Sequence, residues 1–448
     1  MTEMSGPETA ALKDKLREQG VKYLMASYVD MHGAIKNKMV PLAHFDHMME
    51  GSELFTGAAL DGVPQSVNDE EVAAHPDPAS CVVLPWNREV ALFASDLWYA
   101  GKPFEAGSRT ILKRQMQAAA GMGYGFNLGI EAEFYVLRQD TDPVSPRRLS
   151  KPCYDGSMVL DNMGWLGELV DAMNGMGWDV YSFDQEDGLG QFEVDFTYAD
   201  AVTMSDRYCF LRLMANKMAE QHGCFASFMP KPYGDRTGSG AHFNMSLSDV
   251  TTGANLFKAP NDPRGCGLSD LGYKFVAGVV RHLPAICAVV APSVNSYKRL
   301  VKQGSMSGFT WAPIFACYGN NNRTNALRIP LAGGRVELRA ADSMCNPYLG
   351  AAMVLAAGLE GIREGLDPGE PNRGNMYLVE PAELEARGIR QLPRTLGEAL
   401  DAFEADPLSR AVMGDAMFTS WLDYKREEWM GYMAHVSQWE TDRYLRFF

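Results

Sequence analysis

The sequence predicts an α+β fold made of a small first domain and a larger second domain. Segments rich in β-branched and aromatic residues alternate with helical patterns along the 448-residue chain, and the end of the chain is mostly helical. Several predicted strands of the larger domain carry polar side chains on one face and apolar side chains on the other. One packed face and one polar face are typical of an antiparallel or mixed sheet.

The first domain is predicted to span residues 1–104 as a small α+β unit. Apolar residues at helical spacing begin it, and segments of strand composition follow. Its predicted elements, in order, are a helix at Pro7–Glu18, a hairpin of Val21–Asp30 and Ala34–Val40 around the turn Met31-His32-Gly33, a loop from Gly51 to Asp77, strands at Cys81–Leu84 and Val90–Phe93, and an exit linker at Gly101–Phe104.

The second domain is predicted to span residues 105–448. It begins with a helix at Ser108–Ala119, for which Ser108 is the expected N-cap and Gly121 and Gly123 are the expected stop. The later elements are, in order, a strand at Phe126–Leu137, a polar Pro-rich loop at Gln139–Pro152, a helix at Leu166–Met176, alternating strands and helices, and final helices at Leu396–Phe403 and Asp406–Leu445.

Composition and charge exclude several classes of function. Hydrophobic residues at 46% and charged residues at 22% indicate an ordinary globular protein. The net charge of −15 argues against a nucleic-acid or acidic-membrane partner, because there is no basic surplus. We expect a cytoplasmic protein, since we find neither a signal peptide nor a run of about 18 apolar residues. The eight cysteines are scattered without C-x-x-C, which favours free thiols over a zinc site or disulfides.

The strand that organises the second domain contains Gly129-Ile130-Glu131-Ala132-Glu133-Phe134-Tyr135. Alternate side chains of a strand share a face, so Glu131 and Glu133 point the same way with their Cβ atoms about 6.5–7 Å apart. Two like charges at this separation repel strongly on a dry face, which calls for a positive partner. Taken alone, the strand is explained more simply as a solvated face with two ordinary glutamates.

Three further segments repeat this design of one polar and one apolar face. The polar side chains are Gln191, Glu193 and Asp195 in the first, His242, Asn244 and Ser246 in the second, and Arg335, Glu337 and Arg339 in the third. The turn before the first segment adds Asp184, Glu186 and Asp187. If these strands were unrelated surface strands, there would be no reason for the acidic residues and the arginines to alternate with apolar residues in the same way. Carboxylates with one histidine form a ligand set for Mg²⁺ or Mn²⁺.

Basic residues gather in the segments around Asn295–Leu300 and Asn320–Pro330, which contain Lys298, Arg299, Arg323 and Arg328. Arginines neutralise phosphate groups by paired hydrogen bonds. No Walker A motif and no G-x-G-x-x-G precedes a helix, so the common nucleotide-binding folds are disfavoured. Each arginine alone could form a surface ion pair, but together with the acidic strands they predict a two-metal site for phosphoryl transfer.

A series of motifs in a specific order and spacing identifies a family. The motifs are Gly129–Glu133, Glu186–Glu193, Lys231-Pro232 with Gly238–His242, Asn295–Leu300, Asn322-Arg323, Arg328-Ile329-Pro330, Arg335–Arg339 and Asn346-Pro347-Tyr348. Over nearly its whole length the chain resembles the glutamine synthetase family, in particular the branch of glutamate–amine ligases that includes glutamate–methylamine ligases. The resemblance implies an N-terminal β-grasp domain and a C-terminal glutamine-synthetase-type catalytic domain with a curved, mainly antiparallel sheet.

The resemblance also implies the ligands of two or three divalent ions, Mg²⁺ or Mn²⁺, in each active site. One ion would be bound by Glu133, Glu186 and Glu193. The other would be bound by Glu131, His242 and Glu337. ATP is the implied co-substrate, and its phosphates would meet Arg323, Arg328 and Arg335, with Asn244 and Ser246 nearby.

The remaining motifs imply how glutamate is held and how the protein assembles. Arg299 resembles the clamp on the α-carboxylate of glutamate, Gly238 a backbone contact to the amino acid, and Arg339 the partner of its γ-carboxyl group. Glu131 and His242 would border the same substrate site. The implied reaction forms γ-glutamyl phosphate from ATP and glutamate, and an amine then displaces the phosphate. The implied assembly is a dodecamer of two hexameric rings, with each active site completed by the N-terminal domain of a neighbour.

Four positions depart from the pattern of the ammonia-using members. The departures are Thr56 for an aspartate that helps to deprotonate ammonium, Ser305 for a glutamate that covers the site, Thr237 for an asparagine before Gly238, and Asn244 for a histidine. Asp61 is a possible substitute for the missing aspartate. Losing two acidic residues removes charge and leaves room for a methyl group, which Trp311 or Phe309 could line. We therefore expect methylamine or another small alkylamine as the second substrate.

Two alternatives stay open. A glutamine synthetase that uses ammonia and whose loops have drifted would show the same departures. A non-catalytic member that serves as an assembly protein would have lost metal ligands, whereas the six expected positions all hold Glu or His. Tyr377 resembles a tyrosine that some bacterial members adenylylate, but an ordinary loop tyrosine is the better interpretation. The preferred metal, the ring count and any feedback regulation stay open.

Overall fold

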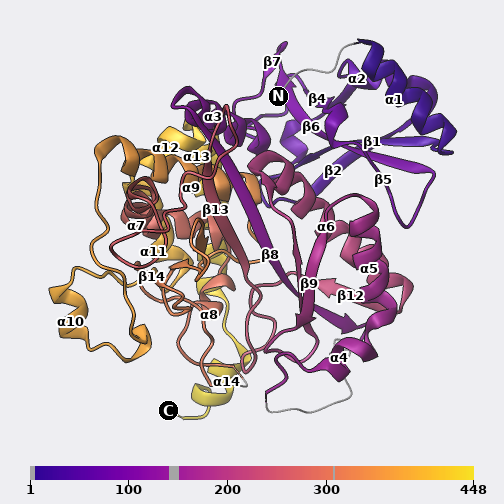
Figure 1. Cartoon of the computed structure of the whole chain (residues 1–448). Coiled ribbons are helices and arrows are strands. Elements are labelled where there is room, and N and C mark those ends of the chain that lie inside the picture. The colour runs from indigo at the N-terminus through magenta and orange to yellow at the C-terminus, as the bar shows by residue number, and fades with distance from the viewer. Residues whose placement is uncertain (1–5, 141–150, 306–307, 448) are drawn as a thin grey trace.

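Two β-sheets organise the chain, a seven-stranded sheet near the N-terminus and a nine-stranded sheet in the remainder. The computed structural model describes residues 6–140, 151–305 and 308–447. The smaller sheet and helix α1 lie to one side of the molecule, and the long strand β8 crosses its centre (Figure 1). The predicted α+β fold is confirmed, with a small barrel-like sheet followed by a mixed, largely antiparallel one.

The smaller sheet has the strand order β2-β1-β6-β4-β3, and β5 and β7 pair with β6. Its elements are α1 (Gly6–Glu18), β1 (Tyr23–Val29), β2 (Ile35–Pro41), α2 (Phe45–Met49), β3 (Glu53–Phe55), β4 (Val72–Pro76), β5 (Val82–Val83), β6 (Val90–Tyr99) and β7 (Lys102–Pro103). Strand β1 pairs antiparallel with β2 and parallel with β6. The buried side chains of Leu16, Leu24, Phe45 and Phe93 form a core of its own.

The structure confirms the first helix, the hairpin and the strands after Cys81, and corrects two predictions for this region. The segment from Gly51 to Asp77 was predicted to be a loop but contains β3 and β4, which pair with each other. Strand β4 carries alanine and proline, which have weak strand preference, so its neighbours and not its composition determine it. The predicted linker at Gly101–Phe104 contains β7, which pairs with the end of β6.

The larger sheet has the strand order β14-β15-β16-β13-β8-β10-β9, with β11 and β12 also paired to β8. Its strands are β8 (Tyr124–Arg138), β9 (Val180–Gln185), β10 (Gln191–Phe196), β11 (Ala199–Asp200), β12 (Cys224–Ser227), β13 (Ala241–Asp249), β14 (Tyr318–Asn320), β15 (Leu327–Ile329) and β16 (Val336–Leu338). Within the described ranges, β14 and β15 form its parallel pair and the other pairs are antiparallel. The predicted strands around Glu131, Glu193, His242 and Glu337 are confirmed as β8, β10, β13 and β16.

Helices cover the apolar face of the larger sheet. The helices of this part of the chain are α3 (Ser108–Gly121), α4 (Gly156–Asp161), α5 (Met163–Gly175), α6 (Ala201–Gln221), α7 (Asp270–Val290), α8 (Ser296–Arg299), α9 (Pro347–Glu364), α10 (Pro381–Ala386), α11 (Leu396–Ala405), α12 (Pro407–Met413), α13 (Asp415–Ala434) and α14 (Gln438–Tyr444), and only some of them pack on that face. Leu128, Ile130, Ala132 and Phe134 of β8 are buried in one core with residues of these helices. The N-cap of α3 is Gly107 and not the predicted Ser108, which is the first helical residue. The predicted loop after Gln139 lies mostly outside the described residues.

Helix α9 is delimited by its own sequence. The Asn346 side chain caps its first turn by accepting hydrogen bonds from the backbone N–H groups of Tyr348 and Leu349, and Pro347 takes the first helical position. Gly365 ends the helix in the left-handed conformation. The neighbouring helix α7 is long and apolar enough to cross a membrane by composition, but 78% of its most apolar window is buried inside the fold, which makes it a core helix.

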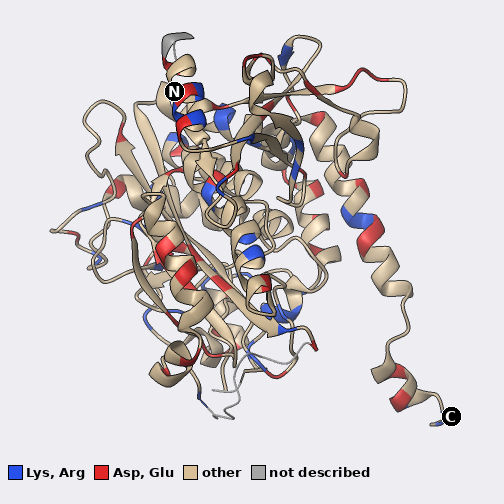
Figure 2. Cartoon of the chain, turned by 90° about the vertical axis from the view of Figure 1, so that its right-hand side faces the viewer, with Lys and Arg blue, Asp and Glu red and all other residues tan. Residues whose placement is uncertain are grey.

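The end of α13 and helix α14 lead away from the body of the chain to the C-terminal end (Figure 2). We call residues 430–447 the C-terminal arm. Its exposed large apolar side chains are Met430, Tyr432, Met433, Val436, Trp439, Tyr444, Leu445 and Phe447. A chain segment of this composition on the surface is typical of a contact with another molecule.

One buried arginine connects the two sheets. Arg109, at the start of α3, is 5% exposed. Its guanidinium Nη2 lies 2.7 Å from Asp77 Oδ2 and 3.0 Å from Asp206 Oδ2, and its Nη1 lies 3.0 Å from Asp96 Oδ1. Asp77 and Asp96 belong to the smaller sheet region and Asp206 to α6. The largest apolar core also contains residues from both regions, so the division at residues 104 and 105 stays a prediction.

Candidate active site

The register of the larger sheet brings the predicted polar residues together on one face. His242 of β13 lies opposite Glu131 of β8, and Glu193 of β10 lies opposite Glu133 of β8. Glu337 of β16 lies opposite Asn244 on one side and Arg328 on the other. Because opposed residues on adjacent strands share a face, the carboxylates, the histidine and the arginines converge, as their common phase in the sequence predicts.

The first group of carboxylates consists of Glu133, Glu186 and Glu193, whose ligand oxygens lie within 4.8 Å of one another. The Oε2 atom of Glu133 accepts hydrogen bonds from the backbone N–H of Gly240 at 2.7 Å and from Gln191 Nε2 at 3.2 Å. Burial and repulsion from Glu133 raise the pKa of Glu186 to about 8. Burial and the neighbouring Glu186 also raise the pKa of Glu193 well above its usual range.

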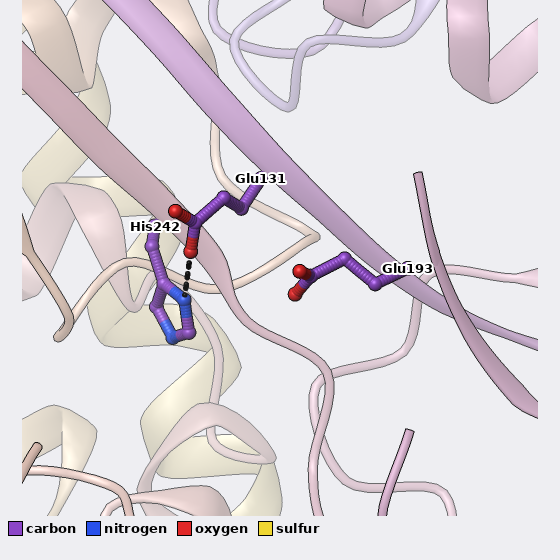
Figure 3. A group of neighbouring side chains, drawn as sticks. All are labelled: Glu131, Glu193 and His242. Carbon is purple, nitrogen blue, oxygen red and sulfur yellow. Dashed lines mark hydrogen bonds and ion pairs between the residues drawn. The ribbon is translucent and has the colours of Figure 1, made fainter. Parts of the chain in front are cut away.

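The second group consists of Glu131, Glu193 and His242, whose ligand atoms again lie within 4.8 Å of one another. Figure 3 shows the three side chains pointing toward a common point from β8, β10 and β13. The Nδ1–H of His242 donates to Glu131 Oε2 at 3.0 Å, and its Nε2 lies 3.3 Å from Arg299 Nη2. Burial and the nearby Arg339 guanidinium lower the pKa of His242 to about 3, so the ring is a neutral imidazole.

Glu193 takes part in both groups, whereas Glu337 lies slightly apart from the second. The Oε1 atom of Glu337 is 3.7 Å from His242 Nδ1. Its Oε2 atom accepts a hydrogen bond from Arg328 at 2.5 Å, and Oε1 pairs with Arg339. Two arginines thus neutralise this fully buried carboxylate, and its role as a metal ligand stays a prediction.

The donor set of the two groups suits Mg²⁺ or Mn²⁺. Carboxylate oxygens with one neutral imidazole are ligands that these ions accept. The raised pKa values of Glu186 and Glu193 follow first from burial and second from repulsion by neighbouring carboxylates. A divalent cation among these oxygens would offset that repulsion, so the residues present fit the ions that the sequence predicts.

A cavity of about 750 Å³ opens in front of these groups and contains the predicted arginines. Arg299 and Arg339 are only 4% and 6% exposed. The Arg299 guanidinium donates to the backbone oxygens of Ala340 at 3.3 Å and Arg339 at 3.1 Å. Arg339 Nε donates to the Arg323 backbone oxygen at 3.2 Å. Backbone acceptors therefore fix both guanidinium groups before any substrate arrives, which reduces the entropy lost on binding.

The other three predicted arginines lie at the edge of the same cavity. Arg328 Nη2 donates to Asn321 Oδ1 at 2.8 Å, and Arg335 Nε donates to Asn244 Oδ1 at 2.9 Å. Arg323 is exposed and also lines the cavity. A second cavity of about 410 Å³ adjoins it and is lined by Asn244, Ser246, Arg335 and the exposed aromatic residues Tyr181 and Tyr198. Arg335 lines both cavities, so one extended molecule with several phosphate groups could occupy them together.

Gly238 lies where the cavity approaches Arg299 most closely. A Cβ atom at position 238 would lie 2.4 Å from the Pro230 backbone oxygen and 2.8 Å from Arg299 Cγ. Only glycine fits such a space without moving its neighbours. The backbone oxygen of Gly238 accepts a hydrogen bond from Gln191 Nε2 at 3.1 Å, which ties this loop to β10.

The predicted amine-binding residues are only partly brought together. Trp311 lines the cavity, and its backbone oxygen lies 3.5 Å from Arg339 Nη2. Phe309 and Ser305 are not among the described residues that line the cavity. The Phe309 ring packs on Trp311 and on Tyr377, with centroids 6.0 and 5.3 Å away. Ser305 Oγ donates to the Phe309 backbone oxygen at 2.6 Å, so it supports this loop from outside the cavity.

Thr56 and Asp61 lie in the N-terminal region, away from this cavity. Thr56 follows β3 and is exposed, and neither residue is among the described residues that line the cavity. Asp61 Oδ2 lies 3.5 Å from His32 Nε2 and 3.5 Å from the Tyr424 hydroxyl. A role for Thr56 in the active site of its own chain therefore has no support from this geometry.

The cavity residues that sequence reasoning missed include Cys153 and Tyr154, which directly follow the Pro-rich loop. Tyr154 adopts φ 63°, the cavity residue Trp311 adopts φ 57°, and Asn321, which accepts a hydrogen bond from Arg328, adopts φ 46°. Non-glycine residues in the left-handed region are strained and concentrate at functional sites. Neither aromatic residue has a sequence signal for this conformation, because aromatic residues seldom adopt it.

Tyr377 is an ordinary buried residue, as its sequence context favours. It is 4% exposed, and its hydroxyl donates to the Ala312 backbone oxygen at 2.5 Å. A modifying enzyme would have to displace this hydrogen bond to reach the hydroxyl. The eight cysteines are all free, six of them buried, as predicted.

The chain is similar to known proteins over nearly its whole length. Residues 105–444 match the family described as glutamine synthetase, catalytic domain. The chain is 41% identical to a glutamate–methylamine ligase of Methyloversatilis universalis, over 97% of this chain and 98% of that protein. It is 37% identical to a glutamine synthetase of Rhizobium leguminosarum bv. phaseoli, over 96% of this chain and 98% of that protein. Among solved structures, a GmaS complex with ADP superposes with a TM-score of 0.91 at 37% identity, covering 97% of this chain and 99% of the other.

Proposed function

Because the chain belongs to the glutamine synthetase family, as an ATP-dependent glutamate–amine ligase, we propose that its amine substrate is methylamine. The products would be γ-N-methylglutamine, ADP and phosphate, with γ-glutamyl phosphate as the intermediate. The methylamine ligase of Methyloversatilis universalis, similar over 97% of this chain, supports this choice of amine. The geometry around Trp311 supports it independently.

Charge neutralisation is the main task of the site. The γ-carboxylate of glutamate and the triphosphate of ATP are both anionic and approach only if positive groups cancel their repulsion. We assign Arg323, Arg328 and Arg335 to the phosphates of ATP, with Asn244 and Ser246 on the side of the adjoining cavity. We assign Arg299 and the Gly238 backbone to the amino-acid end of glutamate, and Arg339 to its γ-carboxyl group.

The carboxylate groups on the floor would hold two divalent ions. We assign Glu133, Glu186 and Glu193 to one ion and Glu131, His242 and Glu337 to the other, with Glu193 close enough to serve both. When bound, such ions supply Lewis-acid stabilisation of the phosphoryl oxygens. Glu131 and His242 would in addition border the bound glutamate.

The position of Trp311 carries the choice of amine. Arg339, which we assign to the γ-carboxyl group, lies within 3.5 Å of the Trp311 backbone oxygen. The amine must attack the γ-carbon, so the Trp311 side chain lies beside its approach. An indole ring gives a methyl group an apolar contact, whereas an ammonium ion needs acceptors for four N–H groups. Neither Thr56 nor Ser305 supplies a charge for ammonium.

Steady-state kinetics with glutamate and ATP test this proposal directly. We expect kcat/KM for methylamine to exceed that for ammonia by about 10-fold or more, since one methyl group in a fitted apolar pocket is worth about 1–3 kcal/mol. ADP release and formation of γ-N-methylglutamine are the two measurements. A higher kcat/KM for ammonia would contradict the proposal and favour the second candidate, a glutamine synthetase.

The second candidate rests on the 37% identity to a glutamine synthetase over nearly the same length. It differs from the first only in the amine, so the same measurement separates them. A silent assembly protein is disfavoured because both groups keep the carboxylates and the histidine that could hold a metal ion. ATP-dependent phosphate release by the purified protein would exclude it.

We also propose the double-ring assembly that the family resemblance implies. Thr56 is exposed and is not among the described residues that line the cavity of its own chain, which suits a residue that acts on a neighbour. The exposed apolar side chains of the C-terminal arm supply a second contact surface. Sedimentation velocity would give the mass of the assembly, and a monomer under assay conditions would contradict this proposal.

A further inference from the structure

We propose that Asp187, held in place by Thr237, accepts the ammonium group of a substrate. This inference rests on the proposed function, because it needs a site that takes glutamate and an amine. Both substrates carry a primary ammonium group at neutral pH, on the α-carbon of glutamate and on the amine itself. The arginines of the cavity repel such a group, and we have assigned Glu131, Glu133, Glu186 and Glu193 to metal ions.

Asp187 lies in the turn between β9 and β10, directly after Glu186. It is 5% exposed and lines the larger cavity together with Thr237 and Gly238. Its place beside Gly238 puts it on the side of the cavity that we assign to the amino acid.

Thr237 orients the carboxylate. Its hydroxyl donates to Asp187 Oδ2 at 2.7 Å. The backbone oxygen of Thr237 in turn accepts a hydrogen bond from the Tyr135 hydroxyl at 2.7 Å. Tyr135 stands on β8, two residues after Glu133, so the strand that carries the metal ligands also fixes the residue that orients Asp187.

Two glutamine side chains fix the turn itself. Gln191 accepts a hydrogen bond from the Gly188 N–H at 3.0 Å and donates to the Gly238 oxygen at 3.1 Å, which connects the Asp187 turn with the Gly238 loop. Gln185 Nε2 donates to the Gly188 oxygen at 2.5 Å. A Cβ atom on Gly188 would lie 1.9 Å from the Tyr135 hydroxyl oxygen, so the turn packs directly against that side chain. Such support is what a preorganised recognition group requires.

Two other aspartates, Asp184 and Asp195, also line the cavity but are worse candidates. Asp195 lines the second cavity as well, together with Asn244 and Ser246, on the side that we assign to the nucleotide. Asp184 lies opposite Glu193 in the pairing of β9 with β10. Asp187 contacts the Gly238 loop through the Thr237 hydroxyl, and within the described part of the chain neither of the other two aspartates makes such a contact.

The Asp187→Asn substitution tests the proposal, because it removes the charge and keeps the shape. If Asp187 binds the α-ammonium, KM for L-glutamate rises about 10- to 100-fold, the scale of one hydrogen bond to a charged group. The inhibition constant of glutarate, which lacks the ammonium group, stays unchanged. If Asp187 binds the amine instead, KM for methylamine rises by that factor while KM for L-glutamate stays unchanged. Either result supports an ammonium acceptor and identifies its source.

A matched control and a rescue separate recognition from structural damage. Asp235→Asn makes the same charge change on the loop that carries Thr237, at an exposed residue outside the cavity lining, and should leave all constants within about 2-fold. Thr237→Val should reproduce part of the Asp187→Asn effect, whereas Thr237→Ser, which keeps the hydroxyl, should behave like the unmodified protein. Mn²⁺ affinity, measured by electron paramagnetic resonance, should not change in any of these variants.

The proposal is overturned if the Asp187→Asn constants for L-glutamate, glutarate and methylamine change by one common factor, or if none of them changes. It is also overturned if Mn²⁺ affinity falls with them, since Asp187 would then act through the metal site. Failure of the proposed function is a separate result, because the unmodified protein would then show no amine-dependent ADP release.

Discussion

The floor and the rim of the active-site cavity are built in different ways. The floor consists of side chains on β8, β10, β13 and β16, and its residue Glu337 is 0% exposed. The rim on the amine side consists of loop residues, and its residue Trp311 is 42% exposed and adopts φ 57°. Neighbouring strands hold the floor in register, whereas the rim depends on a few contacts around Phe309 and Arg339.

This difference separates chemistry from selectivity. Carboxylates on paired strands cannot shift without breaking the register of the sheet, so phosphoryl transfer has a rigid base. Loop residues can be exchanged while the sheet stays intact. We therefore expect substitutions in the floor to abolish the reaction and substitutions in the rim to change which amine is used.

The largest effect is expected from the floor residue Glu133. The Glu133→Gln substitution should lower ATP-dependent phosphate release about 1,000-fold or more, because stabilisation worth several kcal/mol is lost with a metal ligand. Calorimetry should show weaker Mn²⁺ binding. The melting temperature in chelator should not fall, since the amide oxygen can still accept from Gly240 and one repelling charge is gone. Glu168→Ala, at an exposed ion pair with His222, is the control.

Activity of the Glu133→Gln variant within about 10-fold of the unmodified protein would contradict the metal assignment. It would also end the distinction between floor and rim, because a floor ligand would then be as replaceable as a loop residue.

An intermediate effect is expected from the rim residue Trp311. The Trp311→Ala substitution should reduce the ratio of kcat/KM for methylamine to that for ammonia about 10-fold, since an apolar contact to one methyl group is lost. Trp311→Phe keeps an aromatic ring and should preserve most of the ratio. Both variants should bind Mn²⁺ normally. Equal loss of activity with both amines would show that Trp311 serves the floor by supporting Arg339 and does not select the amine.

The smallest effect is expected from His282, which lies in the helical part away from both regions. Its ring nitrogens lie 2.7 Å from Asp406 Oδ2 and 2.7 Å from Glu360 Oε1. Burial opposes the charged ring, but these two carboxylates outweigh it and raise the pKa of His282. The stability from this contact is fully present below the unfolded pKa of about 6.5 and is lost as pH rises through the folded pKa.

His282→Gln should therefore destabilise the protein by about 1 kcal/mol near pH 6 and by less near pH 9, as judged from melting temperatures. The ratio between the two amines should stay unchanged. Substituting Asp406 would be less informative, because its side chain also caps α12. An equal loss of stability at both pH values would show that packing, and not the charged ring, stabilises this contact.

The floor could be predicted from the sequence because its signal is periodic. Glu131, Glu193, His242 and Glu337 occupy the same phase of separate strands, and pairing of those strands makes them neighbours. The sequence also predicted the strands themselves, since each has an unbroken apolar face. The sequence did not reveal that Glu193 belongs to both ligand groups, because this depends on the register in which β10 pairs with β8.

The rim could be predicted only as a list of residues. Trp311 and Phe309 were the two alternatives for lining the amine side; Trp311 lines the cavity, whereas Phe309 packs against Trp311 and Ser305 supports the loop from outside. Tyr154 was missed because its position in the cavity depends on its left-handed backbone conformation, which the residue types of this segment do not predict. Strands β3, β4 and β7 were missed as well, because their pairing partners and not their composition determine them.

The buried Arg109 has a consequence for how this chain can be divided or recombined. Separating the two sheets would take Asp77 and Asp96 away from the Arg109 guanidinium, which would keep Asp206 on its own side, and breaking such a buried set costs about 3–5 kcal/mol. We therefore expect that neither half can be replaced by the corresponding half of a related protein unless all four residues are kept compatible in the chimaera. The junction, more than either sheet, determines which chimaeras of this fold will be viable.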